Sequence, residues 1–207
     1  QFKGSYYQYS KNQDYQGYDV GPTTVTKTPF TYSIKGVTLG GPIIKNKLFF
    51  FVSAEQVRQD APATSLAASD ATHAPGGNYS QANADTLTAL SNFLKSKFGY
   101  DPGAFQGYTF KSYSDKITAK IDWNINSKNT FTLKYNYLKS FADQFASGSR
   151  PGSGQVTGGQ PGTYSMPFYG SGYVINNNFN ILIGELNTRF NNKLSNKLQI
   201  GLTQLRD

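Results

Sequence analysis

The fold of this chain is decided by one stretch, Gly40-Gly41-Pro42-Ile43-Ile44-Lys45-Asn46-Lys47-Leu48-Phe49-Phe50-Phe51. A glycine–proline break and an asparagine flanked by lysines predict a tight polar turn, and a strongly apolar strand follows it directly. The same unit, two strands joined by a short polar turn, recurs twice more, and the connections between the units are long. Short turns that alternate with long loops are typical of a membrane-spanning β-barrel.

Strict alternation of apolar and polar residues is clearest on both sides of the turn Asn126-Ser127-Lys128-Asn129. Each run has about ten residues, which is the length that a tilted strand needs to cross a bilayer. The apolar face would contact lipid, and aromatic residues near strand ends would form interfacial girdles. The side chains expected on this face, with the aromatic ones near strand ends, are Ile117, Ile121, Trp123, Leu133, Tyr135, Tyr137 and Phe190.

Seven strands are expected, one near residues 2–10 and the others in three hairpins near residues 30–58, 110–140 and 174–207. The short turns would be periplasmic, and the long connections would be extracellular loops near residues 11–29, 59–108 and 142–173. Seven strands leave an open sheet edge, which cannot lie in lipid, so the chain is expected to be a segment of a longer protein. The expected fold class is therefore all-β, as part of a transmembrane antiparallel β-barrel.

One helix is expected within the second long loop, over residues 83–98, with apolar residues at helical spacing. Asn83 is a suitable N-cap, and Gly99 is a suitable stop. This helix either packs within its own loop, or lies on the rim of the barrel or at a substrate site. The third long loop contains a glycine-, serine- and proline-rich stretch at residues 147–154, which is expected to be mobile.

The composition is polar, with 37% hydrophobic residues and a net charge of +8. No run of about 18 apolar residues exists, so no transmembrane helix is expected. The absence of cysteine excludes disulfides, zinc–cysteine sites and thiol catalysis. The single histidine, His73, lies in a long loop, so no catalytic residue, metal or cofactor is expected, and the chain is not expected to be an enzyme. Lysines and arginines are scattered rather than clustered, which argues against a nucleic-acid partner.

Several stretches of the chain resemble TonB-dependent outer-membrane receptors of the Oar-like type, which are common in Bacteroidetes. Residues 2–12 resemble the phrase that follows the plug domain in that family and opens the barrel. Residues 40–51 resemble its first periplasmic hairpin nearly residue for residue, with Asn46 where aspartate is usual. The expected helix and the following Tyr100-Asp101-Pro102-Gly103 are similar to the family's large early loop, and residues 115–137 are similar to its next hairpin.

This resemblance implies a barrel of about 22 strands with a plugged lumen, and active solute uptake across the bacterial outer membrane, powered through TonB. The solute would be a siderophore, an oligosaccharide or a peptide. The partners would be outer-membrane lipid, the plug domain and TonB, the last two outside this chain, and a surface lipoprotein is a further candidate. The residues expected to face the lumen or the plug are Lys116, Lys120, Asp122, Lys134, Glu185 and Arg189. Two alternatives stay open: a soluble β-sandwich of the carbohydrate-binding or adhesin type, and a passive or secretion-linked outer-membrane barrel.

Overall fold

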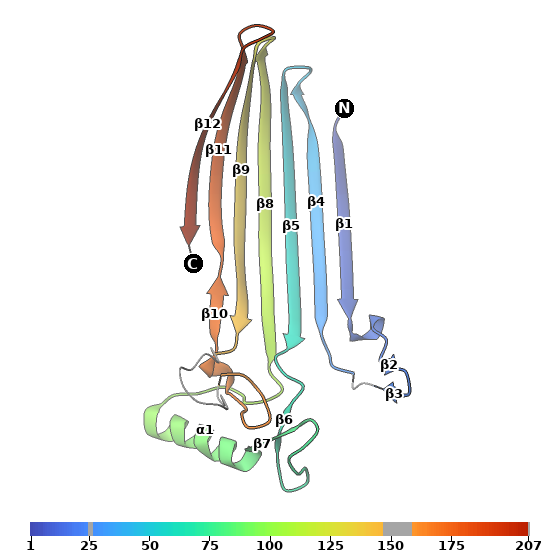
Figure 1. Ribbon diagram of the computed structural model, residues 1–207, viewed down its shortest axis with the longest axis vertical. Coiled ribbons are helices and arrows are strands. Elements are labelled where there is room, and N and C mark those ends of the chain that lie inside the picture. Colours follow the sequence, from blue (N-terminus) through green and yellow to red (C-terminus); the bar gives the residue numbers. More distant parts are fainter. Residues whose placement is uncertain (25–26, 147–158, 207) are drawn as a thin grey trace.

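The computed structural model describes residues 1–24, 27–146 and 159–206, and most of them belong to one antiparallel sheet (Figure 1). Within these residues the strand order is β1-β4-β5-β8-β9-β11-β12, and β10 also pairs with β9. The strands of this sheet are β1 (Lys3–Asn12), β4 (Thr31–Ile44), β5 (Leu48–Pro62), β8 (Thr109–Asn126), β9 (Asn129–Gln144), β10 (Tyr173–Asn176), β11 (Asn178–Arg189) and β12 (Ser195–Arg206). The long connections hold β2 (Asp19–Val20), β3 (Thr23–Thr24), β6 (Ala67–Ser69), β7 (Tyr79–Asn83), the helix α1 (Ala84–Phe98) and two short 3-10 turns, η1 (Gln13–Tyr15) and η2 (Tyr169–Ser171). The expected antiparallel β architecture with one helix is confirmed.

Short turns close three strand pairs at one end of the sheet, and the long connections lie at the other end (Figure 1). Asparagine side chains shape two of these turns. The side-chain oxygen of Asn126 accepts hydrogen bonds from the backbone N–H groups of Lys128 and Asn129, at 2.9 and 3.0 Å. Asn191 accepts equivalent bonds two and three residues ahead of it. Because the asparagine oxygen satisfies the donors of the turn, a few residues suffice to reverse the chain.

The glycine–proline motif before the first short turn is part of a strand rather than a break. β4 continues through both glycines and the proline, and a bulge follows the proline. The glycines make room for aromatic rings. A Cβ at Gly41 would lie 2.5 Å from the Phe2 ring, and one at Gly40 would lie 3.2 Å from the Phe51 ring. The chain reverses only after the bulge, around Asn46, which has a φ of 61°.

Strand register sorts the side chains of the sheet onto two faces. Cross-strand partners point the same way, so the apolar residues of β8 share one face with those of β5 and β9. This apolar face forms a band about 20 Å long measured along the strands, or about 15 Å high, given ~3.3 Å per residue and a strand tilt of about 40°. Its residues include Val37, Leu39, Phe50, Val52, Ile117, Ile121, Trp123, Leu133, Tyr135, Tyr137, Leu182, Leu186, Leu198, Ile200 and Leu202. We call the opposite surface the polar face.

Backbone pairing of β5, β8 and β9 continues beyond the apolar band toward the long loops, so these strands are longer than the band. Tyr135 and Tyr137 consequently lie near the middle of β9, and the expectation that they lie near a strand end is wrong. Tyr137 pairs with Ile117 in the last apolar row on the long-loop side. Trp123 lies close to the short-turn end of β8, and Phe190 directly follows the last residue of β11.

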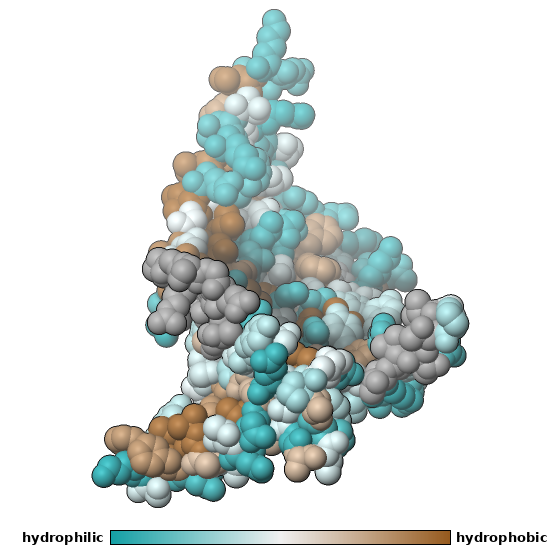
Figure 2. Space-filling view, turned by 60° about the horizontal axis from the view of Figure 1, so that its bottom comes forward, coloured by the Kyte–Doolittle hydropathy of each residue, from teal (hydrophilic) through white to brown (hydrophobic). Residues whose placement is uncertain are grey.

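Helix α1 begins and ends where the sequence predicts. The side chain of Asn83 accepts a hydrogen bond from the N–H of Thr86 at 3.0 Å, and Gly99 takes the left-handed conformation that ends the helix. The helix contacts β7 within its own loop and buries none of its residues. Its exposed apolar side chains are Leu90, Phe93 and Phe98. Figure 2 shows a brown, hydrophobic patch over α1. No helix in the described residues is long and apolar enough to cross a membrane.

Candidate functional site

The six charged residues that were expected to face a lumen or plug all lie on the polar face. Cross-strand pairing places them there: Lys120 pairs with Lys134, and Thr132 lies between Asp122 and Glu185. They do not meet at one point, because they are spread over four rows of three strands. The rows hold, in order toward the short turns, Lys116; Lys120 and Lys134; Asp122 and Glu185; and Arg189. The polar face is therefore a wall with separate charged clusters. That this wall lines a lumen stays a prediction.

The first cluster joins three strands around Glu55 of β5. Tyr7 of β1 donates a hydrogen bond to Glu55 Oε2 at 2.6 Å, and the ammonium of Lys116 on β8 lies 2.8 Å from Oε1. Tyr7 reaches across β4 because Gly36 has no side chain beneath its ring. Each carboxylate oxygen of Glu55 therefore has its own partner, and the side chain is only 24% exposed. The sequence assigned Lys116 to this face, but it did not reveal the contacts of Glu55 with Tyr7 and Lys116, because only the strand register brings these residues together.

The second cluster lies nearer the short turns, on β8 and β9. The Lys120 ammonium lies 2.8 Å from Asp122, two residues further along the same strand. The Thr132 hydroxyl donates a hydrogen bond to Asp122 at 2.8 Å. Lys134 is the direct cross-strand partner of Lys120, and like charges in this position repel each other. The carboxylate of Asp122 compensates for part of this repulsion.

The third cluster spans β11 and β12. The Lys197 ammonium lies 2.7 Å from Glu185 Oε2, and the side-chain amide of Asn187 donates to Oε1 at 2.7 Å. Arg189 follows on the same face at the end of β11, and within the described residues no carboxylate lies at ion-pair distance from it. The sequence places Asn187 on the same side as Glu185 and Arg189, whereas its cross-strand partner Lys197 was missed.

Two phenylalanines interrupt the polar face near the short turns. Phe49 and Phe51 alternate with Phe50 along β5, so the continuous apolar run of this strand divides between the two faces. Phe49 pairs with Asp122, and Phe51, which is 40% exposed, pairs with Lys120. An unbroken apolar run shows no alternation, which is why its division between the faces was not visible in the sequence.

At the other end of the sheet, buried polar contacts join the second and third long loops. Ser80 of β7 is fully buried, and its hydroxyl donates toward the carbonyl oxygens of Gly162 and Thr163, at 2.8 and 3.0 Å. The backbone N–H of Gln81 donates to the same Thr163 carbonyl at 2.7 Å. The two loops therefore form one joined unit. The stretch 147–154, which was expected to be mobile, lies outside the described residues.

A second set of contacts continues this unit next to the sheet. The backbone N–H groups of Tyr169 and Gly170 donate to the carbonyls of Ala104 and Pro102, both at 2.8 Å. The approach requires a glycine, because a Cβ at Gly170 would lie 2.8 Å from the Pro102 oxygen. The ring of Tyr108 packs edge-on against Tyr169, and burial raises the pKa of the Tyr108 hydroxyl. These contacts hold the joined loops over the ends of β8 and β10.

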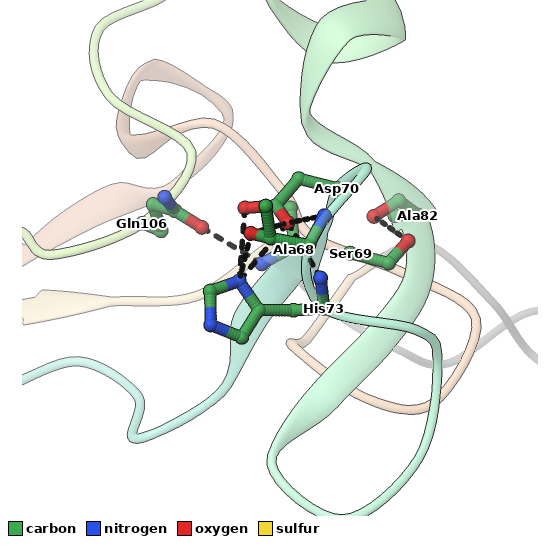
Figure 3. Close-up of polar contacts among 7 residues, drawn as sticks. Ala68, Ser69, Asp70, His73, Ala82 and Gln106 are labelled. Atoms are coloured by element: carbon green, nitrogen blue, oxygen red, sulfur yellow. Dashed lines mark hydrogen bonds and ion pairs between the residues drawn. The ribbon is translucent and has the colours of Figure 1, made fainter.

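A groove of about 630 Å³ opens between the connections that precede β4, follow β5 and precede β8. Its polar lining is mostly uncharged: Lys27, Thr28, Thr64, Ser65, Asn78, Gln106 and Thr109. The carboxylate of Asp14 pairs with Lys27 and raises the pKa of its ammonium, which keeps it charged. Gln106 is held in place because its side-chain oxygen accepts a hydrogen bond from the Ala68 N–H at 2.7 Å (Figure 3). Hydroxyl and amide groups around a cavity suit recognition of a polar solute through hydrogen bonds.

The single histidine is part of a hydrogen-bonded turn in the second long loop (Figure 3). His73 Nδ1 lies 2.9 Å from Asp70, and its ring stacks on Tyr79 with the centroids 4.5 Å apart. The Thr72 hydroxyl, together with the backbone N–H groups of Thr72 and His73, donates to Asp70 and holds the pKa of that carboxyl well below its usual range. In the part of the chain that the structure describes, no three histidine, cysteine or carboxylate side chains are placed to hold a metal ion.

Comparison with known proteins identifies the family. A family model described as an outer membrane beta barrel domain matches residues 1–207, so the chain belongs to this family. No curated protein and no solved structure gave a match. The expected location in the bacterial outer membrane is confirmed, and membership of this family excludes the soluble β-sandwich. In barrels of this kind an apolar band faces the lipid and the interior is polar.

Proposed function

We propose that this chain forms an early part of the barrel wall of a TonB-dependent transporter, with about 22 strands and a plugged lumen in the whole barrel. The polar face carries this proposal. Its charged clusters recur from β5 to β12: two of them lie at heights where the opposite face is apolar, and the Glu55 cluster lies at the long-loop edge of the apolar band. Such a wall requires an interior filled by water or by protein, because charged groups are costly in lipid. The resemblance of residues 2–12 and 40–51 to TonB-dependent receptors favours the plugged form.

The main role of the polar face, in this proposal, is to hold the plug domain. Within the described residues, Lys134 and Arg189 have no ion-pair partner, so their charges are available to carboxylates on a plug. Phe49 and Phe51 add an apolar surface near the short turns, which would lie on the periplasmic side. Several separate contacts of this kind can hold a plug in place and still be released one by one.

Recognition of the solute is assigned to the joined loops and their groove. Uncharged polar side chains such as Asn78 and Ser65 suit a solute with many hydrogen-bonding groups, whether a siderophore, an oligosaccharide or a peptide. The solute would cross unchanged, so the protein is not an enzyme in this proposal. A surface lipoprotein that closes over the loops would contact the exposed Phe93 and Phe98 of α1.

Uptake by whole cells tests the transport proposal. Cells that produce the whole protein receive labelled solutes of the three classes, with or without TonB and with or without a proton uncoupler. Uptake should fall to background when TonB is absent or the proton gradient is dissipated, while binding at the cell surface persists. Uptake that continues without TonB would contradict the proposal and would indicate a passive or secretion-linked barrel.

A substitution in the groove tests the assignment of solute recognition. Asn78→Ala removes a polar side chain from the groove and should weaken surface binding several-fold without affecting assembly of the barrel. Asn92→Ala, on the exposed surface of α1, is the matched control and should leave binding unchanged. Equal binding by both variants would exclude this part of the groove from the solute site.

A further inference from the structure

We propose that the apolar face binds a phosphate-bearing acyl lipid of the outer leaflet, with its acyl chain in a shallow groove and its phosphate near Lys35 and Lys139. The inference rests on the outer-membrane family and on the geometry of this face, and it is independent of any transported solute. The outer leaflet is meant because the long loops, which are extracellular in such barrels, lie beyond this end of the apolar band.

The apolar face ends abruptly at one row of polar residues on the long-loop side. Cross-strand pairing aligns this polar row over β1, β4, β5, β8 and β9: Gln8, Lys35, Gln56, Asp115 and Lys139. The adjacent row, one step toward the short turns, is apolar and aromatic: Tyr6, Val37, Ala54, Ile117 and Tyr137. A boundary with aromatic residues on its apolar side is typical of the level at which headgroups meet acyl chains.

A groove of about 370 Å³ crosses this boundary. Ala54 is its smallest apolar side chain and lies between the larger Val37 and Ile117. Val37 and Ile117 are 49% and 41% exposed, so the groove offers an acyl chain an open apolar floor. Tyr6 lines the groove from β1, and Lys35, Gln56 and Asp115 line its polar end. Lys139 lies just outside the groove, as the cross-strand partner of Asp115.

The polar row carries an excess of positive charge. Its carboxylate, Asp115, already accepts hydrogen bonds from the Arg58 guanidinium at 2.6 Å and from the Gln56 amide at 3.2 Å. Lys35 and Lys139 are exposed, and within the described residues neither has an ion-pair partner. Unpaired lysines next to an apolar groove match a phosphate that is attached to acyl chains, whereas a zwitterionic headgroup gives them no net attraction.

Lipid retention by the purified whole protein tests this site. The probes are bisphosphorylated lipid A and the same lipid after removal of its phosphates, each at equal mole fraction in phosphatidylcholine nanodiscs. Native mass spectrometry of the released protein counts the bound lipid copies. Lys35→Gln combined with Lys139→Gln should weaken retention of the phosphorylated lipid about thirtyfold, given the attraction of each lysine for an anionic surface. The same double variant should not change retention of the dephosphorylated lipid.

Matched variants separate this site from general effects on the barrel. Lys45→Gln with Lys47→Gln removes the same charge at the first short turn and should leave retention unchanged. Ala54→Phe fills the groove and should displace the lipid, whereas Ala119→Phe, on the same face outside the groove, should not. Heat-modifiable migration in gels confirms that each variant is folded. Equal retention of both lipid forms, or no effect of the double variant at the polar row, would overturn the proposal.

Discussion

Tyr7 of β1 and Glu55 of β5 are joined by a 2.6 Å hydrogen bond, although β4 lies between their strands. Tyr7 is the cross-strand partner of Gly36 on β4, and a Cβ at this glycine would lie 2.2 Å from the Tyr7 ring. The ring therefore covers the glycine and reaches the next strand. Glycine inside a strand is otherwise unfavourable, and an aromatic partner compensates for it.

Gly36→Ala should destabilise the sheet. The added methyl group would clash with the Tyr7 ring, and the displaced ring would lose its hydrogen bond to Glu55. Overpacking of this kind costs about 1–3 kcal/mol in free energy of unfolding. The measurement is urea-induced unfolding of the whole protein in liposomes, followed by its heat-modifiable migration in gels.

Gly201→Ala on β12 is the matched control for this substitution. Gly201 lies on the same polar face, opposite Ile183, and a Cβ there would meet its nearest neighbours at an ordinary contact distance of 3.8 Å. Alanine loses less backbone entropy than glycine on folding, so stability should be unchanged or slightly higher. If the two variants were equally stable, Gly36 would not act as space for Tyr7.

Asp122→Asn should reveal the repulsion between Lys120 and Lys134. The asparagine can still accept the hydrogen bond from Thr132, but it no longer compensates for the charge of Lys120. We expect a loss of about 0.2–1 kcal/mol in unfolding free energy, since the pair is partly exposed, and a smaller loss at high salt. Adding Lys134→Gln should restore most of this stability. A loss that the second substitution does not restore would assign the effect to the Thr132 contact instead.

Features of this fold that depend on local sequence could be predicted, because a few neighbouring residues determine them. The alternation over residues 116–125 gives a strand and its two faces together, since only every second side chain reaches one face. Asn83 and Gly99 act within one helical turn and locate both ends of α1. The run at residues 48–52 gave the strand but not its faces, because it has no alternation.

Contacts that depend on register or on distant loops could not be predicted in the same way. Glu55 meets Tyr7 and Lys116 only when three strands pair in one particular register. Ser80 meets Thr163 across two long loops, and neither segment shows a local pattern that points to the other. The charged residues of a barrel wall can therefore be assigned to a face from sequence, whereas their partners require the structure.

Ser80→Ala should separate the second and third long loops. The variant leaves the carbonyl oxygens of Gly162 and Thr163 without their hydroxyl donor, which costs about 0.5–1.5 kcal/mol in local opening free energy. Hydrogen exchange at the Gln81 amide should accelerate, while exchange within the sheet should not change. Ser96→Ala, whose hydroxyl bonds only within α1, is the control. Unchanged exchange at Gln81 would mean that the backbone bond to Thr163 joins the loops without Ser80.

The turn around His73 should persist to a lower pH than the usual pKa of an aspartate would allow. Hydrogen bonds from the Thr72 hydroxyl and from the backbone N–H groups of Thr72 and His73 lower the pKa of Asp70. A carboxyl with a depressed folded-state pKa stabilises the folded loop above its unfolded value of about 3.9. This contribution is lost as the pH falls through the folded-state pKa. The turn should therefore be unchanged from neutral pH down to about pH 4, and should open only in stronger acid.

The carboxyl ¹³C chemical shift of Asp70, followed against pH in the labelled protein, measures this directly. The midpoint should lie below about 3.9, the value of a free aspartate. Thr72→Ala removes the hydroxyl donor that contributes most to the lowered pKa, so its midpoint should move up toward the free value. A midpoint close to the free value in the unchanged protein would mean that these donors do not bind the carboxylate. The turn of His73 would then be held by its stacking on Tyr79 rather than by Asp70.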